Sequence, residues 1–166
     1  IEEYFNGEDR NSLHDSRSVG KSFASTMLGI AIEENHITNE KAFLNDFYNL
    51  KSFKNYSKKK DSVTLESLLS MSSGFVGDDS DYNNPGNEEN MYPTSNWVKF
   101  SLDLPMHKTK KIGKDFTYFT AGVVILGDVI HKSVPDGLTS YADKKLFAPL
   151  NITNYKWQYT PQKVAN

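Results

Sequence analysis

The sequence contains no cysteine, so neither a disulfide framework nor a thiolate metal site is possible in this chain. No stretch approaches the ~20 consecutive apolar residues that a membrane-spanning helix requires. Neither sign of charge dominates, since 19 Lys and Arg stand against 21 Asp and Glu and the net charge is -2 at pH 7. We therefore expect neither nucleic acid nor an anionic membrane as a partner.

The chain also lacks internal repeats and low-complexity tracts, and its 166 residues correspond to about one domain. A hydrophobic fraction of 37% with 13% aromatic residues is enough to form a core. The four histidines, His14, His36, His107 and His131, have no partner at the spacing of a helical zinc pair. We expect one compact unit over residues 1–166 that holds no metal or other cofactor.

What the sequence does contain is a series of apolar-periodic segments bounded by polar ones. Residues 1–7 have the pattern of a strand that enters a turn. Capping residues and periodicity predict helices over residues 18–34, 40–47, 64–74, 122–131 and 141–146, with Thr64 as an N-cap and Gly74 as a stop. Apolar residues over 97–104 mark one more element, of unassigned type, that Pro105 stops.

The motif Ser18-Val19-Gly20-Lys21 opens the longest of these segments. A serine at a helix start lies near unpaired backbone N–H groups, and a lysine three residues later lies on the same face. If Phe23 and helix packing make the surroundings apolar, the amine of Lys21 would be neutral in a fraction of the molecules and could act as a base. The alternative is a serine N-cap followed by an exposed lysine.

The same spacing occurs a second time, at Ser57-Lys58-Lys59-Lys60. About one or two such matches are expected by accident in a chain this rich in serine and lysine. The second motif lies in a polar run without apolar periodicity, so we expect Lys60 to be solvated and protonated.

A second informative segment, Tyr118-Phe119-Thr120, opens another apolar-periodic stretch a hundred residues later. A serine, a lysine one turn on and a tyrosine from elsewhere can together generate an alkoxide nucleophile without histidine. The alternative for Tyr118 is a core aromatic residue ahead of a buried helix.

Four segments together resemble the penicillin-recognising serine hydrolase family, which includes class C β-lactamases, D-alanyl-D-alanine carboxypeptidases, related esterases and 6-aminohexanoate-oligomer hydrolases. They occur in the family's order and span nearly the whole chain. They are His14-Asp15-Ser16-Arg17-Ser18-Val19-Gly20-Lys21-Ser22-Phe23, Leu68-Leu69-Ser70-Met71-Ser72-Ser73-Gly74-Phe75, Tyr118-Phe119-Thr120-Ala121-Gly122 and Phe147-Ala148-Pro149-Leu150-Asn151-Ile152.

The resemblance implies an acyl-enzyme mechanism on an ester, β-lactam or amide substrate, in a periplasmic or secreted protein. Ser18 matches the nucleophile, Lys21 matches the lysine that activates it, and Tyr118 matches the tyrosine that relays a proton. Thr120 stands where the family often has an asparagine that contacts the lysine and the substrate, and a hydroxyl cannot reproduce the amide's fork.

The family's third motif, a Lys-Thr-Gly or His-x-Gly strand downstream of the tyrosine, is missing. Lys108-Thr109-Lys110 lacks the glycine and precedes Tyr118, so we expect it to belong to a solvated basic loop. Because the chain also begins without methionine and stops in polar sequence, we expect a fragment: the helix-rich part of an α+β, β-lactamase/transpeptidase-like fold, with an N-terminal strand and the rest of the sheet missing. Such a fragment is expected to be inactive alone and to dimerise or to bind a complementary piece.

Residues 77–90 form the most polar loop, and they raise a rival function. Asp79, Asp81 and Asn83 repeat the alternate oxygen ligands of a calcium loop, but Asn84 and Asn90 occupy the positions that need glycine and glutamate. The rival is therefore a non-catalytic binding protein with a calcium loop on the same scaffold. The plainer alternative for the loop is the rim of an active site.

Overall fold

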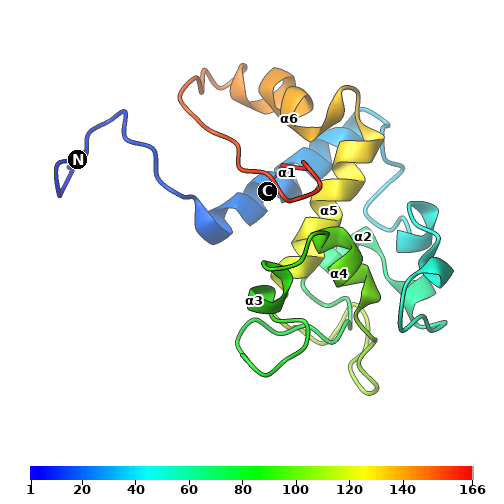
Figure 1. Ribbon diagram of the computed structural model, residues 1–166. Coiled ribbons are helices and arrows are strands. Elements are labelled where there is room, and N and C mark those ends of the chain that lie inside the picture. Colours follow the sequence, from blue (N-terminus) through cyan, green and yellow to red (C-terminus); the bar gives the residue numbers. More distant parts are fainter. Residues whose placement is uncertain (166) are drawn as a thin grey trace.

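The computed structural model describes residues 1–165, and helices and turns make up its regular structure. The longest helices are α1 (Gly20–Glu33) and α5 (Thr120–Ser133), which pack against each other. Figure 1 shows α5, in yellow, passing through the middle of the molecule with α1, α2, α4 and α6 around it. Every residue of α5 from Val124 to Ile130 is buried, so this helix forms the centre of the core.

The other elements are short. They are the 3₁₀ turns η1 (Arg17–Val19), η2 (Leu44–Asp46), η3 (Leu50–Ser52) and η4 (Lys60–Ser62), the helices α2 (Leu65–Leu69), α3 (Glu88–Met91), α4 (Trp97–Asp103) and α6 (Gly137–Ala142), and the π-helical turn η5 (Asp143–Phe147).

Helix α1 follows the predicted segment closely. It ends at Glu33, and Asn35 then adopts a left-handed conformation with φ 62°, as expected of an asparagine after a helix. Its buried residues are Met27, Leu28 and Ala31. The first turn differs from the expectation, because Val19 remains 65% exposed and the apolar contact with the core begins later in the helix.

Helix α2 begins where the sequence predicts and ends earlier. Thr64 is its N-cap, and its hydroxyl accepts the Ser67 N–H at 3.1 Å in a reciprocal capping box. The prediction that Gly74 ends this helix is wrong. The helix ends at Leu69, and the left-handed Met71 (φ 53°) then turns the chain.

The predicted helix over residues 40–47 is also wrong, since only the turn η2 forms there. Phe43 has extended backbone angles and pairs with Thr64 in an isolated bridge, and this pairing replaces helical hydrogen bonds. Leu44 is fully buried as expected, whereas Phe43 is 47% exposed. The predicted helices over residues 122–131 and 141–146 correspond to α5 and to α6 with η5, with ends shifted by a few residues, and the element over 97–104 is the helix α4.

The predicted N-terminal strand is absent from the structure of residues 1–165. Figure 1 shows the first dozen residues as an irregular arm that points away from the helices. A strand needs a partner for its backbone groups, and the described residues form only three isolated antiparallel bridges. Of the predicted α+β architecture, these residues supply the helix-rich part. None of their helices is long and apolar enough to span a membrane.

Candidate active site

Ser18 and Lys21 come together at the start of α1. Ser18 lies in the 3₁₀ turn η1, and Lys21 lies in the first turn of the helix that follows directly. This arrangement places the two side chains on one face, with Lys21 Nζ 3.1 Å from Ser18 Oγ. The Ser18 hydroxyl caps no backbone N–H of the helix, which distinguishes it from a serine N-cap.

Tyr118 contacts the same serine from the segment that leads into the other long helix, α5. It lies just before α5, and its hydroxyl donates a hydrogen bond to Ser18 Oγ at 2.6 Å. Lys21 Nζ lies 5.2 Å from the centroid of the tyrosine ring, within the range of a cation–π contact. The fold thus brings together the serine, lysine and tyrosine that the sequence singles out, and the core aromatic residue of this segment is Phe119, which is 3% exposed.

The backbone before the serine has an unusual conformation. Arg17 has a φ of 48°, in the left-handed region that costs a non-glycine residue roughly 1 kcal/mol. Asp15 holds Arg17 there, because its carboxylate accepts the Arg17 backbone N–H at 2.9 Å and pairs with the guanidinium. The Ser18 N–H makes no hydrogen bond to another residue of the described chain, so it is free to meet an oxyanion.

The site is open to solvent. Ser18 is exposed, while Lys21 and Tyr118 are each half-buried. Among residues 1–165, no carboxylate pairs with Lys21, so no counter-ion holds its ammonium. The apolar setting that we expect from Phe23 is not formed around Lys21, since Phe23 packs on Phe147 at 5.8 Å between ring centroids and the ring near Lys21 is that of Tyr118.

Thr120 lies in the first turn of α5, two residues after Tyr118. Its hydroxyl oxygen is buried and has no hydrogen-bond partner among the described residues. The contact that the family's asparagine makes with the lysine therefore has no counterpart here, and substrate binding by Thr120 stays a prediction. Thr120 is fixed through its backbone instead, because its N–H donates to Asp79 Oδ2 at 2.6 Å.

Residues 77–90 form a folded loop that ends in α3. The buried Asn87 side chain caps α3 and donates to the carbonyls of Asp78, Asp79 and Asp81 at 3.1–3.3 Å. Both carboxylate oxygens of Asp79 accept backbone N–H groups, so they are not available as calcium ligands. No cluster of three metal-binding side chains occurs in residues 1–165. The calcium alternative therefore has no structural support.

The second Ser-x-x-Lys motif differs from its prediction. Lys60 is fully buried, and its ammonium donates to the carbonyl oxygens of Leu102 at 2.6 Å and of Lys54 at 3.0 Å. Burial lowers the pKa of Lys60 to about 8, although the nearby Asp103 opposes the shift. The Ser57 hydroxyl is buried without a hydrogen-bond partner among residues 1–165. The expectation of a solvated lysine here is wrong, because neighbouring backbone carbonyls create a binding site for its ammonium that local sequence does not reveal.

The loop near residue 108 is exposed at Lys108, Thr109, Lys111 and Lys114, as expected, and it is also tied to neighbouring segments. The Lys59 ammonium donates to the carbonyls of His107 and Lys110. Lys110 is half-buried, and its ammonium donates a hydrogen bond to the Thr117 hydroxyl. Thr117 precedes Tyr118, and its N–H also donates to the carbonyl of Met71 at 2.8 Å. This loop therefore supports the backbone just before Tyr118.

Comparison with known families adds an independent finding. The model of the family described as Beta-lactamase matches residues 4–166, and the match includes all the positions discussed above. No curated protein matches the chain.

Proposed function

The chain belongs to the beta-lactamase family of penicillin-recognising serine hydrolases, and on that premise we propose that Ser18 is the nucleophile of an acyl-enzyme mechanism. The observation that carries the proposal is the position of the Ser18 hydroxyl between Lys21 Nζ at 3.1 Å and the Tyr118 hydroxyl at 2.6 Å. Both distances allow direct proton transfer.

In the proposed acylation step, Lys21 takes the proton of the Ser18 hydroxyl while Oγ bonds to the substrate carbonyl carbon. Tyr118 donates its hydrogen bond to Ser18 Oγ as this oxygen loses its proton, and it then gives its own proton to the leaving group as the bond to that group breaks. The Lys21 ammonium then returns a proton to the Tyr118 phenolate. A water molecule then hydrolyses the ester on Ser18 by the same relay in reverse.

The oxyanion in this mechanism needs two donors. The Ser18 N–H, which has no other partner in the described chain, is the first. We assign the second donor and one wall of the cleft to the third motif of the family, a strand that follows the tyrosine.

The proposed substrates are small esters, β-lactams or amides, since all of them form the same acyl-enzyme. The proposal also places the protein in the periplasm or outside the cell, where such substrates are met by the family it resembles. Turnover of p-nitrophenyl esters and of nitrocefin by the full protein tests the function. We expect the parent protein to hydrolyse one of these substrates and the Ser18→Ala variant not to. Hydrolysis that persists in the variant would show that another group is the nucleophile.

A second test concerns residues 1–166 alone. Without a second oxyanion donor the turnover should fall by ~100- to 1,000-fold, and it should fall further because the substrate is poorly positioned. We expect the isolated segment to form dimers or to bind a complementary segment, because Val19 and other apolar side chains are exposed beside the site. A monomer with the turnover of the full protein would contradict this part of the proposal.

A further inference from the structure

We propose that Asp79 is a positioning residue that holds Tyr118 against Ser18, an inference that rests on the role given to Tyr118 above. Asp79 touches neither the serine nor the lysine. It acts through the backbone that follows the tyrosine, at the Tyr118 carbonyl and the Thr120 N–H.

The two hydrogen bonds that carry the proposal hold the backbone between Tyr118 and Thr120. The backbone N–H of Asp79 donates to the carbonyl of Tyr118 at 2.9 Å, and the Asp79 carboxylate accepts the N–H of Thr120 at 2.6 Å. The second bond is charge-assisted and lies at the N-terminus of the long helix α5, where a negative charge is favoured. Rotation of the tyrosine backbone away from Ser18 would break both bonds.

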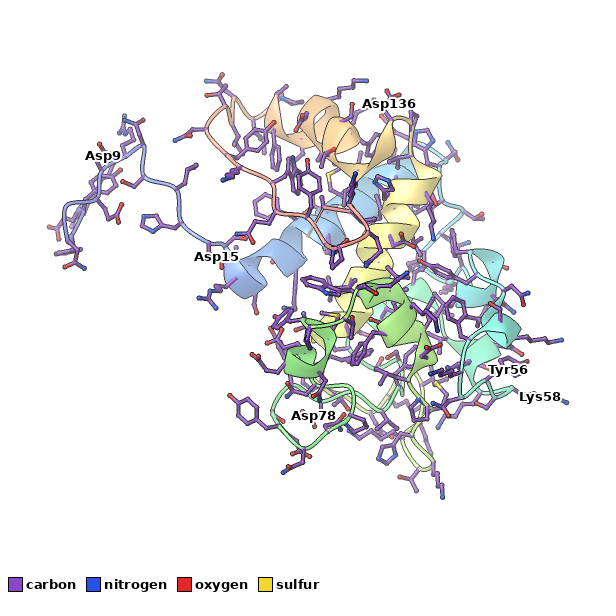
Figure 2. The ribbon with its side chains drawn as sticks, viewed as in Figure 1. Asp9, Asp15, Tyr56, Lys58, Asp78 and Asp136 are labelled. Atoms are coloured by element: carbon purple, nitrogen blue, oxygen red, sulfur yellow. The ribbon has the colours of Figure 1, made fainter. Side chains whose placement is uncertain are left out.

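Asp79 is itself held rigidly. Its second carboxylate oxygen accepts the N–H of Glu88, the first residue of α3, at 2.8 Å. Asn87, which is 1% exposed, donates to the Asp79 carbonyl from within the loop. Figure 2 shows the neighbouring Asp78 on this loop below α3. The loop therefore connects α3 with the start of α5.

Packing restrains the same segment from a second side. The Phe119 ring lies directly over Gly77, where an added β-carbon would come within 2.1 Å of the ring. Phe119 cannot shift toward Gly77 without a clash, so this packing and the Asp79 bonds together restrain the segment. Because a displacement of ~1 Å at a reacting group can cost ~100-fold in rate, these restraints bear on catalysis.

Asp79→Asn is the sharpest variant, because the side chain keeps its shape. Both oxygens of Asp79 accept N–H groups, so an amide nitrogen must face one of them and lose that bond. Asp81→Asn is the matched control in the same loop. Its carboxylate accepts only the nearby Asn83 N–H, at 2.9 Å, and the charge change is the same.

The kinetic test compares an alkyl ester with a p-nitrophenyl ester of the same acid, in the full protein. Tyr118 protonates the leaving group, so Asp79→Asn should lower kcat for the alkyl ester by ~10- to 100-fold and for the activated ester by less. In a Tyr118→Phe background the same substitution should cost no more than about twofold. The proposal would be overturned if the losses in kcat from Asp79→Asn and Tyr118→Phe were fully additive in the double variant, or if Asp81→Asn lowered kcat as much as Asp79→Asn does.

A structural readout separates this proposal from the proposed function. In hydrogen exchange followed by NMR, the Thr120 amide should be protected in the parent and in Asp81→Asn and at least ~10-fold less protected in Asp79→Asn. A parent that forms no acyl-enzyme but shows this pattern refutes the hydrolase function and upholds the positioning of Tyr118. Rapid exchange of the Thr120 amide in the parent, or protection unchanged in Asp79→Asn, refutes the positioning even in an active enzyme.

Discussion

The two Ser-x-x-Lys motifs of this chain share a spacing and differ in everything around it. At the first, the exposed Ser18 hydroxyl lies between a lysine and a tyrosine, and no carboxylate of the described residues holds the lysine. At the second, Lys60 is fully buried and its ammonium donates hydrogen bonds to two backbone carbonyls. The Ser57 hydroxyl has no hydrogen-bond partner among the described residues. In Figure 2, Tyr56 and Lys58 on either side of Ser57 lie across the molecule from Asp15 near the first motif.

Local backbone explains part of this difference. Ser18 and Lys21 belong to one continuous helical path, so their side chains share a face. Lys60 begins the separate turn η4, and its side chain extends inward over the Phe75 ring, 5.6 Å from the centroid. The comparison shows that a lysine near a serine becomes a candidate base only when no other acceptor takes up its ammonium.

The largest expected effect is that of Ser18→Ala. Removal of the nucleophile should lower the acylation rate by at least ~1,000-fold, because no other hydroxyl lies between a lysine and a tyrosine in the described chain. Stopped-flow measurement of p-nitrophenol release checks this. Ser57→Ala in parallel should acylate at the parental rate, and an equal loss in the two variants would erase the distinction between the motifs.

Lys21→Ala should lower the acylation rate by at least ~100-fold, the lower range for general-base catalysis. Its thermal unfolding should stay close to the parent's, because Lys21 is half-buried and pairs with no carboxylate among residues 1–165. The acylation rate and the thermal unfolding curve of the variant are measured on the same protein preparation. A folded variant that acylates as fast as the parent would make Lys21 structural.

Lys60→Ala should have the opposite pattern of effects, with a loss of stability and little change in the acylation rate. The free energy of unfolding should fall by about 2–4 kcal/mol, since the substitution leaves a cavity and two carbonyls without their donor. Urea unfolding measures the loss. Acylation of the fraction that remains folded should be near the parental rate, and a selective loss of acylation without a loss of stability would assign catalytic work to the second motif.

The pH dependence of stability sharpens the same contrast. Folding lowers the pKa of Lys60 from 10.5 to about 8, so between these values the unfolded chain binds more protons and stability rises with pH. The parent should therefore gain stability relative to Lys60→Ala between pH 8 and pH 10.5, by up to about 3 kcal/mol. Urea unfolding of both proteins at pH 7, 8.5 and 10 checks it, and a constant difference would mean that Lys60 is not desolvated.

The smallest expected effect is that of Ser57→Ala on stability. The hydroxyl is buried and unpaired in the described chain, so its removal sacrifices no hydrogen bond. The free energy of unfolding should be unchanged or higher by up to about 1 kcal/mol. A loss above 1 kcal/mol would reveal a hydrogen bond to this hydroxyl that the structure does not show.

The helices and the candidate site could largely be predicted from sequence where the signal is local. Apolar periodicity located α1, α4 and α5, and capping residues located the start of α2. The Ser18 and Tyr118 segments were both marked by the apolar runs that follow them. Their approach in space could be predicted only through the family resemblance, because a hundred residues separate them.

The errors share a physical cause, since each depends on distant partners. The burial of Lys60 requires the Leu102 carbonyl, which lies 42 residues away in sequence. A strand at residues 1–7 would require a neighbouring strand, and the described residues offer none. The role of Asp79 was hidden because its carboxylate also fits a calcium-loop pattern, and only the fold shows that it accepts the Thr120 N–H.

The most direct test of the central claim is to locate the covalent adduct. The full protein is treated with a fluorophosphonate and, separately, with a fluorescent penicillin, and the modified peptide is identified by mass spectrometry. We predict modification of Ser18 and none of Ser57. An adduct on the Ser57 peptide, or a protein that no electrophile modifies at Ser18, would contradict the account.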